Sequence, residues 1–383
     1  MRVCVAYDCL YPYTVGGAER WYRNVAERLA AAGHDVTFIT LRQWPKDERP
    51  EVPGVRVVAV GPRLALYTPS GRRKILPPIV FGAGTLWHLL RSRRYDVVHM
   101  ASFPYFSVLA AAVARPLRRF QLVVDWHEVW TREYWDEYLG RLGVVGWAVQ
   151  LLCARVAHHA FCFSRMHAQR LRDEGFRGEI TILEGQYEPQ EHPPPQPIER
   201  IQPVAVFAGR HIPEKRAPAM VPALAAARRR WPELQGKIYG DGPDRPEVER
   251  LIDDLGLRDA IATPGFAPGR ELHEALARAV CMVLPSRREG YGRVVIEAAS
   301  VGTPSVVVAE DDNAATELVE DGVNGVIAAS AEPEDLADAI LRVRDAGETM
   351  RASTAQWFER NAERLALETS LERVVASYSS NSS

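Results

Sequence analysis

LPSRREGYGRVVIEAASVGTPSVV, residues 284–307, passes from an apolar strand pattern through a glycine-containing loop into a helix pattern and then into a second apolar run. Short runs rich in Val and Ile alternate with helical patterns in the same way along most of the chain. This alternation predicts βαβ units and parallel sheets that are buried on both faces. The expected fold class is therefore α/β.

Two similar halves follow from this pattern, and 383 residues also exceed what one hydrophobic core usually supports. Predicted strands cover residues 2–7, 36–40, 55–60, 97–100, 122–124, 159–164 and 180–183, and then 204–208, 237–239, 260–263, 280–284, 305–308 and 325–328. Between the halves, EPQEHPPPQPIERIQP is polar and rich in proline, which neither a helix nor a central strand tolerates.

The domain division predicted from these features has four parts. Two doubly wound, Rossmann-like domains cover residues 1–190 and 203–360, joined by a proline-rich linker over 191–202. Residues 361–383 form a C-terminal helix that packs back on the first domain, followed by a frayed tail. Because open sheets bind ligands at the carboxyl ends of their strands, the two domains are expected to face each other across a deep cleft.

Composition narrows the function and the compartment. Hydrophobic residues at 47% and charged residues at 25% are typical of a globular enzyme, and the net charge of −2 without a basic-aromatic module disfavours nucleic-acid binding. Five cysteines without a CxxC pair indicate reduced thiols, and the N-terminus lacks a secretory pattern. We expect a cytoplasmic protein, monomeric or homodimeric, and a buried helix rather than a membrane span over residues 144–163.

Basic residues crowd the first half of the chain. They are Arg63, Arg72, Arg73, Lys74, Arg91, Arg93, Arg94, Arg115, Arg118 and Arg119. Such crowding favours an anionic acceptor or an anionic lipid surface, although scattered solvated arginines explain it equally well. The stretch 71–94 also carries large apolar residues, as an interfacial segment or a packed core segment would. Contact with the inner face of the membrane therefore stays open.

The quoted stretch also carries two carboxylates eight residues apart, Glu289 on the loop and Glu297 on the helix. Gly290 and Gly292, on either side of Tyr291, allow a ligand to approach the backbone, and the helix start favours phosphate. The segment resembles the E-x7-E region of retaining glycosyltransferases of the GT-B fold, in particular family 4 (GT4, glycosyl transferases group 1). The resemblance implies that Glu289 binds the transferred sugar, that Glu297 binds the nucleotide ribose and that the glycine loop contacts the donor.

A second segment, VFAGRHIPEKR at 206–216, places Arg210 and Lys215 on a short loop after a strand. Two cations in such a position can hold a leaving diphosphate. The segment is similar to the family's GR-x-x-x-EK element, whose Arg and Lys neutralise the departing nucleoside diphosphate. Solvated surface cations are the alternative.

The first half contributes two further segments. YPYTVGGAER at 11–20 resembles the family's GG loop, which puts Gly16 and Gly17 near the donor phosphate or the acceptor. LVVDWHEVW at 122–130 aligns His127 with the family's active-site histidine, which hydrogen-bonds the transferred sugar; a packed structural histidine is the alternative. Tyr11, Trp126 and Trp130 are candidate acceptor contacts, and the tryptophans fit a core position equally well.

KIYGDGP at 237–243 and TPGFAPG at 263–269 resemble the two family loops that bracket the nucleobase. They assign Gly240, Gly242 and Phe266 to the donor. The first loop is not a dinucleotide fingerprint, because Arg245 stands where a third small residue is needed. A further departure is Glu184-Gly185, where the family often has Asn-Gly at the end of the first domain.

The function implied by the resemblance is retaining transfer of a sugar from a nucleoside-diphosphate sugar, UDP favoured over GDP, to a small-molecule, glycan or lipid-linked acceptor. The acceptor binds the first domain and the nucleotide binds the second. No cofactor and no metal are expected, because Arg210, Lys215 and the amides near Gly292 stabilise the leaving phosphate. The alternatives are a nucleotide-sugar epimerase or phosphorylase on the same frame, or a non-catalytic nucleotide-sugar-binding protein.

Overall fold

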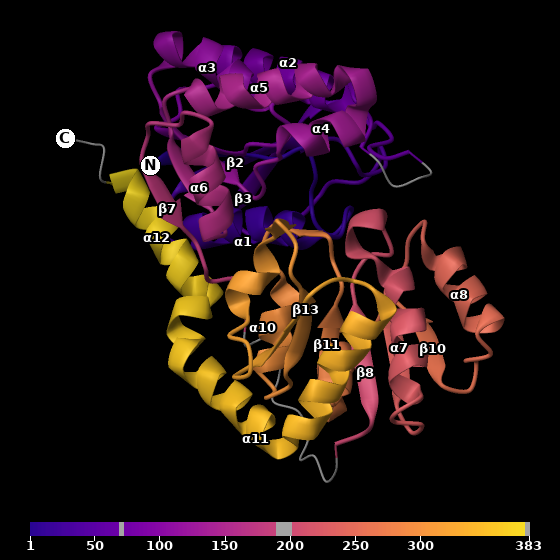
Figure 1. Ribbon diagram of the computed structural model, residues 1–383. Coiled ribbons are helices and arrows are strands. Elements are labelled where there is room, and N and C mark those ends of the chain that lie inside the picture. The colour runs from indigo at the N-terminus through magenta and orange to yellow at the C-terminus, as the bar shows by residue number, and fades with distance from the viewer. Residues whose placement is uncertain (69–72, 189–200, 380–383) are drawn as a thin grey trace. The chain divides into compact units, whose positions relative to one another are not determined.

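The computed structural model describes residues 1–68, 73–188 and 201–379, which fold into two compact units (Figure 1). Of these residues, 1–68, 73–183 and 370–379 belong to the first unit and 184–188 and 201–369 to the second. Most of the predicted linker, residues 191–200, and the end of the predicted tail lie outside the described residues.

The first unit is built on a seven-stranded parallel sheet in the order β3-β2-β1-β4-β5-β6-β7. Its strands are β1 (Arg2–Ala6), β2 (Asp35–Leu41), β3 (Val55–Gly61), β4 (Val97–Ala101), β5 (Gln121–Trp126), β6 (His159–Cys162) and β7 (Ile180–Ile182). The strand order reverses between β1 and β4, so the loops that follow these two strands diverge and leave room for a ligand.

Seven α-helices belong wholly or partly to the described part of this unit: α1 (Gly17–Ala31), α2 (Leu76–Arg91), α3 (Phe106–Arg118), α4 (Arg132–Leu139), α5 (Gly143–Arg155), α6 (Arg165–Asp173) and most of α12 (Leu367–Ser379). A single 3-10 turn, η1 (Gly140–Leu142), precedes α5. Helices α2 and α3 pack together, and α3 also contacts α5, so these three helices form one layer over the sheet (Figure 1).

The second unit is built on a six-stranded parallel sheet in the order β10-β9-β8-β11-β13-β15. Its strands are β8 (Val204–Ala208), β9 (Gln235–Tyr239), β10 (Ile261–Gly265), β11 (Cys281–Leu284), β13 (Ser305–Val308) and β15 (Gly325–Ala328), with β12 (Arg288–Glu289) and β14 (Asp312–Asn313) as a separate parallel pair. The helical segments are η3 (Pro213–Lys215), η4 (Ala217–Ala219), α7 (Met220–Arg228), α8 (Arg245–Asp254), α9 (Gly269–Arg278), α10 (Arg293–Ala299), η5 (Ala314–Leu318) and α11 (Pro333–Leu365).

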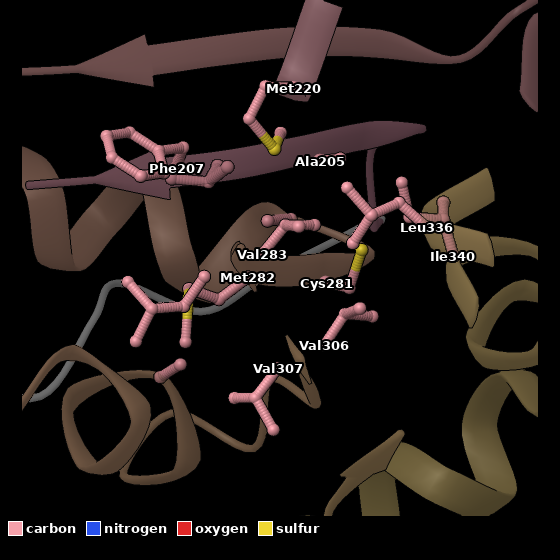
Figure 2. Packing of buried hydrophobic residues seen from close by; sticks show 14 of the residues in the cluster. Ala205, Phe207, Met220, Cys281, Met282, Val283, Val306, Val307, Leu336 and Ile340 are labelled. Atoms are coloured by element: carbon pink, nitrogen blue, oxygen red, sulfur yellow. The ribbon is translucent and has the colours of Figure 1, made fainter. Parts of the chain in front are cut away.

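The core of the second unit fixes the two central strands β8 and β11. Every residue of β11 and β13 is buried, as expected for parallel strands covered on both faces. Phe207 of β8, Met220 of α7 and Leu336 of α11 pack in one cluster with Met282 and Val306 (Figure 2). The loops that leave β8 and β11 therefore start from rigid positions.

Each of the thirteen predicted strand segments falls on a strand of one of the two sheets, and the predicted α/β fold class is confirmed. The short β12–β14 pair was not predicted. The helical pattern after residue 332 breaks at Gly347 (φ 51°, ψ −131°) and again between α11 and α12. The expectation of a buried helix over 144–163 was wrong, because α5 ends at Arg155 and exposes Val144 and Leu152.

Candidate functional site

The strand order of the second unit reverses between β8 and β11, and the loops that follow these strands converge. Lys215, at the end of the β8 loop, donates a hydrogen bond from Nζ to Oε1 of Glu289 on the β11 loop. The backbone of Arg287 also donates to the carbonyl of Glu214, at 2.9 Å. The two sequence segments that carry the predicted cations and the predicted sugar-binding carboxylate thus meet at the position where open α/β sheets bind ligands.

Glu289 is held in place by groups around it and is only 6% exposed. Ser286 Oγ donates to Glu289 Oε1 at 2.8 Å. Strand β12 pairs Glu289 with Asn313, and the Asn313 amide donates to the carbonyls of Ser286 and Val308 at 3.2 and 2.9 Å. The hydrogen bonds that Lys215 and Ser286 make both end on Oε1, so Oε2 can accept a bond from a ligand hydroxyl.

The two cations differ in their surroundings. Arg210 follows β8 directly and is exposed to solvent. Lys215 ends η3 and keeps 22% of its side chain exposed while it contacts Glu289. An ammonium group has three hydrogens, so Lys215 can bind a phosphate oxygen without leaving Glu289. The structure thus brings Lys215 and Glu289 into contact and leaves Arg210 on the same loop, open to a ligand.

The glycine loop before α10 requires glycine at its last position. Gly292 caps the helix with φ 98°, and a Cβ there would lie 2.6 Å from the Cβ of Ala315. Gly290 is half-buried. Farther along the helix, Glu297 is half-buried and lies 3.9 Å from the Arg293 guanidinium. Glu297 lies five residues after Gly292 along α10, so a ligand that contacts both must extend along the helix.

Tyr291 connects this loop to the start of the second unit. Its hydroxyl donates to the backbone carbonyl of Glu184, and burial raises the tyrosine pKa well above its ordinary value. The Glu184 carboxylate in turn pairs with Arg364 of α11 at 2.7 Å. The hydroxyl of Tyr291 is therefore occupied by the backbone of Glu184, and only the ring is left for a donor contact.

The loops after β8, β9 and β10 are packed backbone to backbone. Gly240 has φ 119°, and a Cβ there would lie 1.8 Å from the carbonyl oxygen of Gly209. A Cβ on Gly242 would lie 2.4 Å from the carbonyl oxygen of His211. These two glycines are thus needed for close approach of the β8 loop, whatever they contribute to a ligand. Beyond β10, Phe266 is 70% exposed and free to stack on a planar ligand.

In the first unit, His127 follows β5 and stacks on Phe163, with ring centroids 4.2 Å apart. Burial lowers the pKa of His127, an effect that Asp125 and Glu128 partly offset, so the ring is neutral at neutral pH. Its Nε2 is buried and has no hydrogen-bond partner among the described residues. A neutral imidazole with an unused nitrogen suits a hydrogen bond to a hydroxyl.

The candidate acceptor residues divide into core and surface. Trp126 is fully buried and donates from Nε1 to His158 at 3.0 Å, so the core alternative holds for this tryptophan. Trp130 is half-buried and packs on Trp135, with ring centroids 4.7 Å apart. Tyr11 is also half-buried, with the Arg20 guanidinium 5.4 Å from its ring centroid. Trp130 and Tyr11 remain accessible to an acceptor.

Gly16 and Gly17 lie at the start of α1. Gly16 is the N-cap in an extended conformation, and Gly17 is the first helical residue. A Cβ on Gly16 would lie 2.3 Å from Oε2 of Glu19, whose carboxylate is buried in the first turn. Glycine at position 16 therefore makes room for this carboxylate.

Three residues of the site were not assigned from the sequence: Ser286, Asn313 and His211. Ser286 lies three residues before Glu289 within the quoted stretch, so its position held a usable signal. Asn313 acts through a pairing with a strand of two residues, which no local pattern reveals. His211 lies between the two cations and is fully buried, and nothing in its sequence context predicts that burial.

Within 1–68, 73–188 and 201–379, no three His, Cys, Asp or Glu side chains gather as a group that could hold a metal ion. In the same residues, no helix combines the length and the apolar content needed to cross a membrane.

Comparison with known proteins gives matches to both halves of the chain. The family model "Glycosyltransferase Family 4" matches residues 15–184, and "Glycosyl transferases group 1" matches residues 189–360. An alpha-D-kanosaminyltransferase of Streptomyces kanamyceticus is 35% identical over 144 residues, which are 38% of this chain and only 37% of that relative's length.

Solved structures share the fold along nearly the whole chain. A sucrose-phosphate synthase of Thermosynechococcus elongatus superposes with a TM-score of 0.81 at 18% identity, covering 99% of this chain and 98% of its own. Anabaena HepE, solved in complex with UDP and glucose, gives a TM-score of 0.76 at 19% identity, covering 99% of this chain and all of its own. The two parallel sheets are therefore those of the GT-B fold.

Proposed function

The chain belongs to glycosyltransferase family 4, the group 1 glycosyl transferases, and on this premise we propose that it transfers a sugar from a nucleoside-diphosphate sugar to an acceptor with retention of the anomeric configuration. One observation carries the proposal. The Lys215–Glu289 contact joins the cation loop of β8 to the carboxylate loop of β11 at the reversal point of the second sheet. A cation and a carboxylate in contact suit a ligand that has a phosphate next to a sugar.

The first chemical role concerns the leaving group. As the bond between the sugar and the phosphate breaks, negative charge develops on the diphosphate. Lys215, which Glu289 holds in place, and the exposed Arg210 supply positive charge on one loop. We assign to them the stabilisation that other transferases obtain from a divalent cation, and the proposed reaction is therefore metal-independent.

The second role concerns the sugar. Glu289 uses Oε1 for Lys215 and Ser286, so Oε2 is placed to accept from a sugar hydroxyl. Glu289 orients the sugar ring and does not attack the anomeric carbon. The oxygen of the leaving phosphate takes the proton of the acceptor hydroxyl, on the same face of the sugar. His127 donates or accepts one further hydrogen bond to the transferred sugar through its unused Nε2.

The third role concerns the nucleotide. Glu297 accepts from the ribose, Gly290 and Gly292 let the phosphates approach the backbone, and Phe266 stacks on the base beside the loop that carries Gly240 and Gly242. The exposure of Phe266 supports this assignment. We propose UDP over GDP as the nucleotide, in keeping with the UDP complex of Anabaena HepE, and Tyr11 and Trp130 as acceptor contacts on the first unit.

The test is nucleotide release by the full chain. The purified protein is incubated with UDP- and GDP-sugars and a panel of small-molecule, glycan and lipid-linked acceptors, in the presence and absence of EDTA, and the anomeric configuration of any product is read by NMR. Retention, unchanged rates in EDTA and release of UDP support the proposal.

Other results decide for the alternatives. Isomerised donor without acceptor indicates an epimerase, and phosphate-dependent release of a sugar 1-phosphate indicates a phosphorylase. Tight donor binding without release under any acceptor indicates a binding protein. Activity lost in EDTA and restored by Mg²⁺ refutes metal independence while leaving transfer intact.

A further inference from the structure

The outer surface of helices α2, α3 and α5 is apolar. Four helices or turns supply the large hydrophobic side chains that are more than a third exposed there: Ile75, Leu76, Ile79 and Trp87 at α2, Val113 and Leu117 on α3, Leu142 on η1, and Val144, Val145 and Leu152 on α5. We call this set the apolar helix face. In the described part of the second unit, the only large hydrophobic side chains that are more than a third exposed are Leu255 and Phe266.

The exposure follows the period of a helix. Leu76, Ile79, Ala83 and Trp87 are all exposed and lie three or four residues apart, or a multiple of this, along α2. The positions that would normally carry charged residues on a solvent-facing helix are therefore apolar. Because the opposite side of α2 buries Phe81 and Leu89 against the unit, α2 is apolar on both sides.

Charge on the three helices is of one sign. Their sequences, LPPIVFGAGTLWHLLR, FSVLAAAVARPLR and GVVGWAVQLLCAR, contain no Asp or Glu. The basic residues stand in the last turn of each helix, with Arg91 on α2, Arg115 and Arg118 on α3, and Arg155 on α5. Parallel strands connected by helices bring these three helix ends to the same edge of the unit.

A pocket of about 830 Å³ opens at this edge, between the end of α3 and the segment after α5. Arg115 and Arg119 line it together with Pro116 and Val156. The Arg115 guanidinium donates to the carbonyls of Phe120 and Ala157, whereas Arg119 is exposed. An exposed guanidinium beside apolar walls matches the boundary between a phosphate headgroup and an acyl chain.

From these observations we infer that the apolar helix face docks the chain on the surface of an anionic lipid bilayer, with the arginine ends of α2, α3 and α5 on the headgroup phosphates. Apolar side chains enter the interface, and the arginines gain from the negative surface potential. A second copy of the chain is a poorer occupant, because α2, α3 and α5 of that copy offer no carboxylate to the arginines. Helix α4, which contacts α5 and carries Glu133, Asp136 and Glu137, lies at the border of the face.

The experiment is flotation of the full chain with vesicles. The wild-type chain is expected to float with vesicles of phosphatidylcholine and phosphatidylglycerol at low salt and to stay behind with pure phosphatidylcholine. Salt at about 1 M is expected to weaken the association, because it shortens the screening length to about 3 Å. No flotation of the wild type with anionic vesicles overturns the inference.

Matched variants distinguish binding through the apolar helix face from nonspecific binding of the whole surface to vesicles. Leu117→Gln is compared with Leu255→Gln, since both residues are exposed leucines on different units. The triple change Arg91→Gln, Arg119→Gln and Arg155→Gln is compared with Arg229→Gln, Arg258→Gln and Arg270→Gln, which removes the same charge from exposed positions of the second unit. Leu117→Gln and the arginine triple of the first unit are each expected to lower the fraction of protein bound to vesicles more than their controls do. For the arginine triple the expected decrease is at least about tenfold at low salt.

Two outcomes contradict the inference directly. An equal loss in the second-unit variants means that attraction is spread over the whole surface. A chain that is dimeric by light scattering and becomes monomeric with Leu117→Gln means that a second copy covers the face. Both readouts are independent of transfer activity, so they hold whether or not the proposed reaction is correct.

Discussion

The two units hold their strand-end loops together with ion pairs of different kinds. In the first unit, Arg73 pairs with Asp8 just beyond β1, where the aspartate side chain is fully buried and the arginine side chain 10% exposed. In the second unit, Lys215 pairs with Glu289, and the lysine side chain is 22% exposed. In the first pair the carboxylate is out of solvent and the arginine nearly so, whereas the lysine of the second pair is more open to solvent or a ligand.

This difference indicates a division of labour. A buried pair contributes little net stability when intact, but it costs several kcal/mol when one partner is lost, so it fixes architecture. A cation at a solvent-accessible strand end keeps hydrogens for a ligand. The first unit adds to its buried pair a buried hydrogen-bond network, in which His99 joins Tyr378 of α12 to Asp125, and Asp125 accepts from Trp21. The second unit leaves Arg210 in solvent on the same loop as Lys215.

The largest expected effect is loss of stability in Arg73→Ala. The change leaves the Asp8 carboxylate buried without a cation and is expected to lower the free energy of unfolding by about 3–5 kcal/mol. Tryptophan fluorescence in denaturant reports this, because all tryptophans except Trp231 and Trp357 lie in the first unit.

A double variant sharpens this result. Asp8→Ala together with Arg73→Ala removes both charges and is expected to be less destabilised than Arg73→Ala alone. If the loss of unfolding free energy in the double variant equals the sum of the losses in the two single variants, Asp8 and Arg73 are not coupled. The proposed difference between the ion pairs of the two units would then be wrong.

Lys215→Ala is expected to act on turnover instead. Loss of the fixed positive charge removes about 2.7–4 kcal/mol of transition-state stabilisation, which is about 10²- to 10³-fold in kcat. Lys215→Arg keeps the charge and retains more activity. Arg229→Ala is the control, since Arg229 forms an exposed pair with Glu334 on the same unit. Near-normal kcat in both Lys215→Ala and Arg210→Ala contradicts the assigned role.

The same contrast shows which features of the molecule could be predicted from its sequence. Short buried runs such as β11 and β13, which are mostly apolar, have a local signature, so the strands of both sheets were predictable. Lys215 and Glu289 could be proposed as site residues because each lies in one continuous stretch that carries the family pattern, and the structure brings the two side chains into contact.

What escaped prediction depends on residues far apart in the chain. The Asp8–Arg73 pair, the Tyr378–His99 contact and the Asn313 support for Glu289 join segments that no local spacing relates. Trp126 was open between core and surface, because a tryptophan after a strand has the same local sequence in either position, and only its contact with His158 decides.

The smallest expected effect is the contribution of His158, in the first unit, to the pH dependence of stability. Burial lowers the pKa of His158 to about 4. Trp126 donates to Nε2 at 3.0 Å and the carbonyl of Val156 lies 2.7 Å from Nδ1, so the neutral ring with its proton on Nδ1 satisfies both neighbours. Protonation of Nε2 would bring its N–H against the N–H of Trp126, so neither group could accept a hydrogen bond from the other.

The sign follows from the two pKa values. In the unfolded chain the ring titrates near pH 6.5, so between about pH 6.5 and 4 the unfolded state binds more protons and the free energy of unfolding falls as the pH falls, by up to roughly 3 kcal/mol. Burial raises the pKa of Glu174 to about 7, which works in the opposite direction over a similar range. His158→Gln isolates the histidine: the difference between its denaturant curves and those of the wild type should shrink from pH 7 to 4.5. A difference that stays constant with pH would mean that the His158 ring does not change its protonation on unfolding.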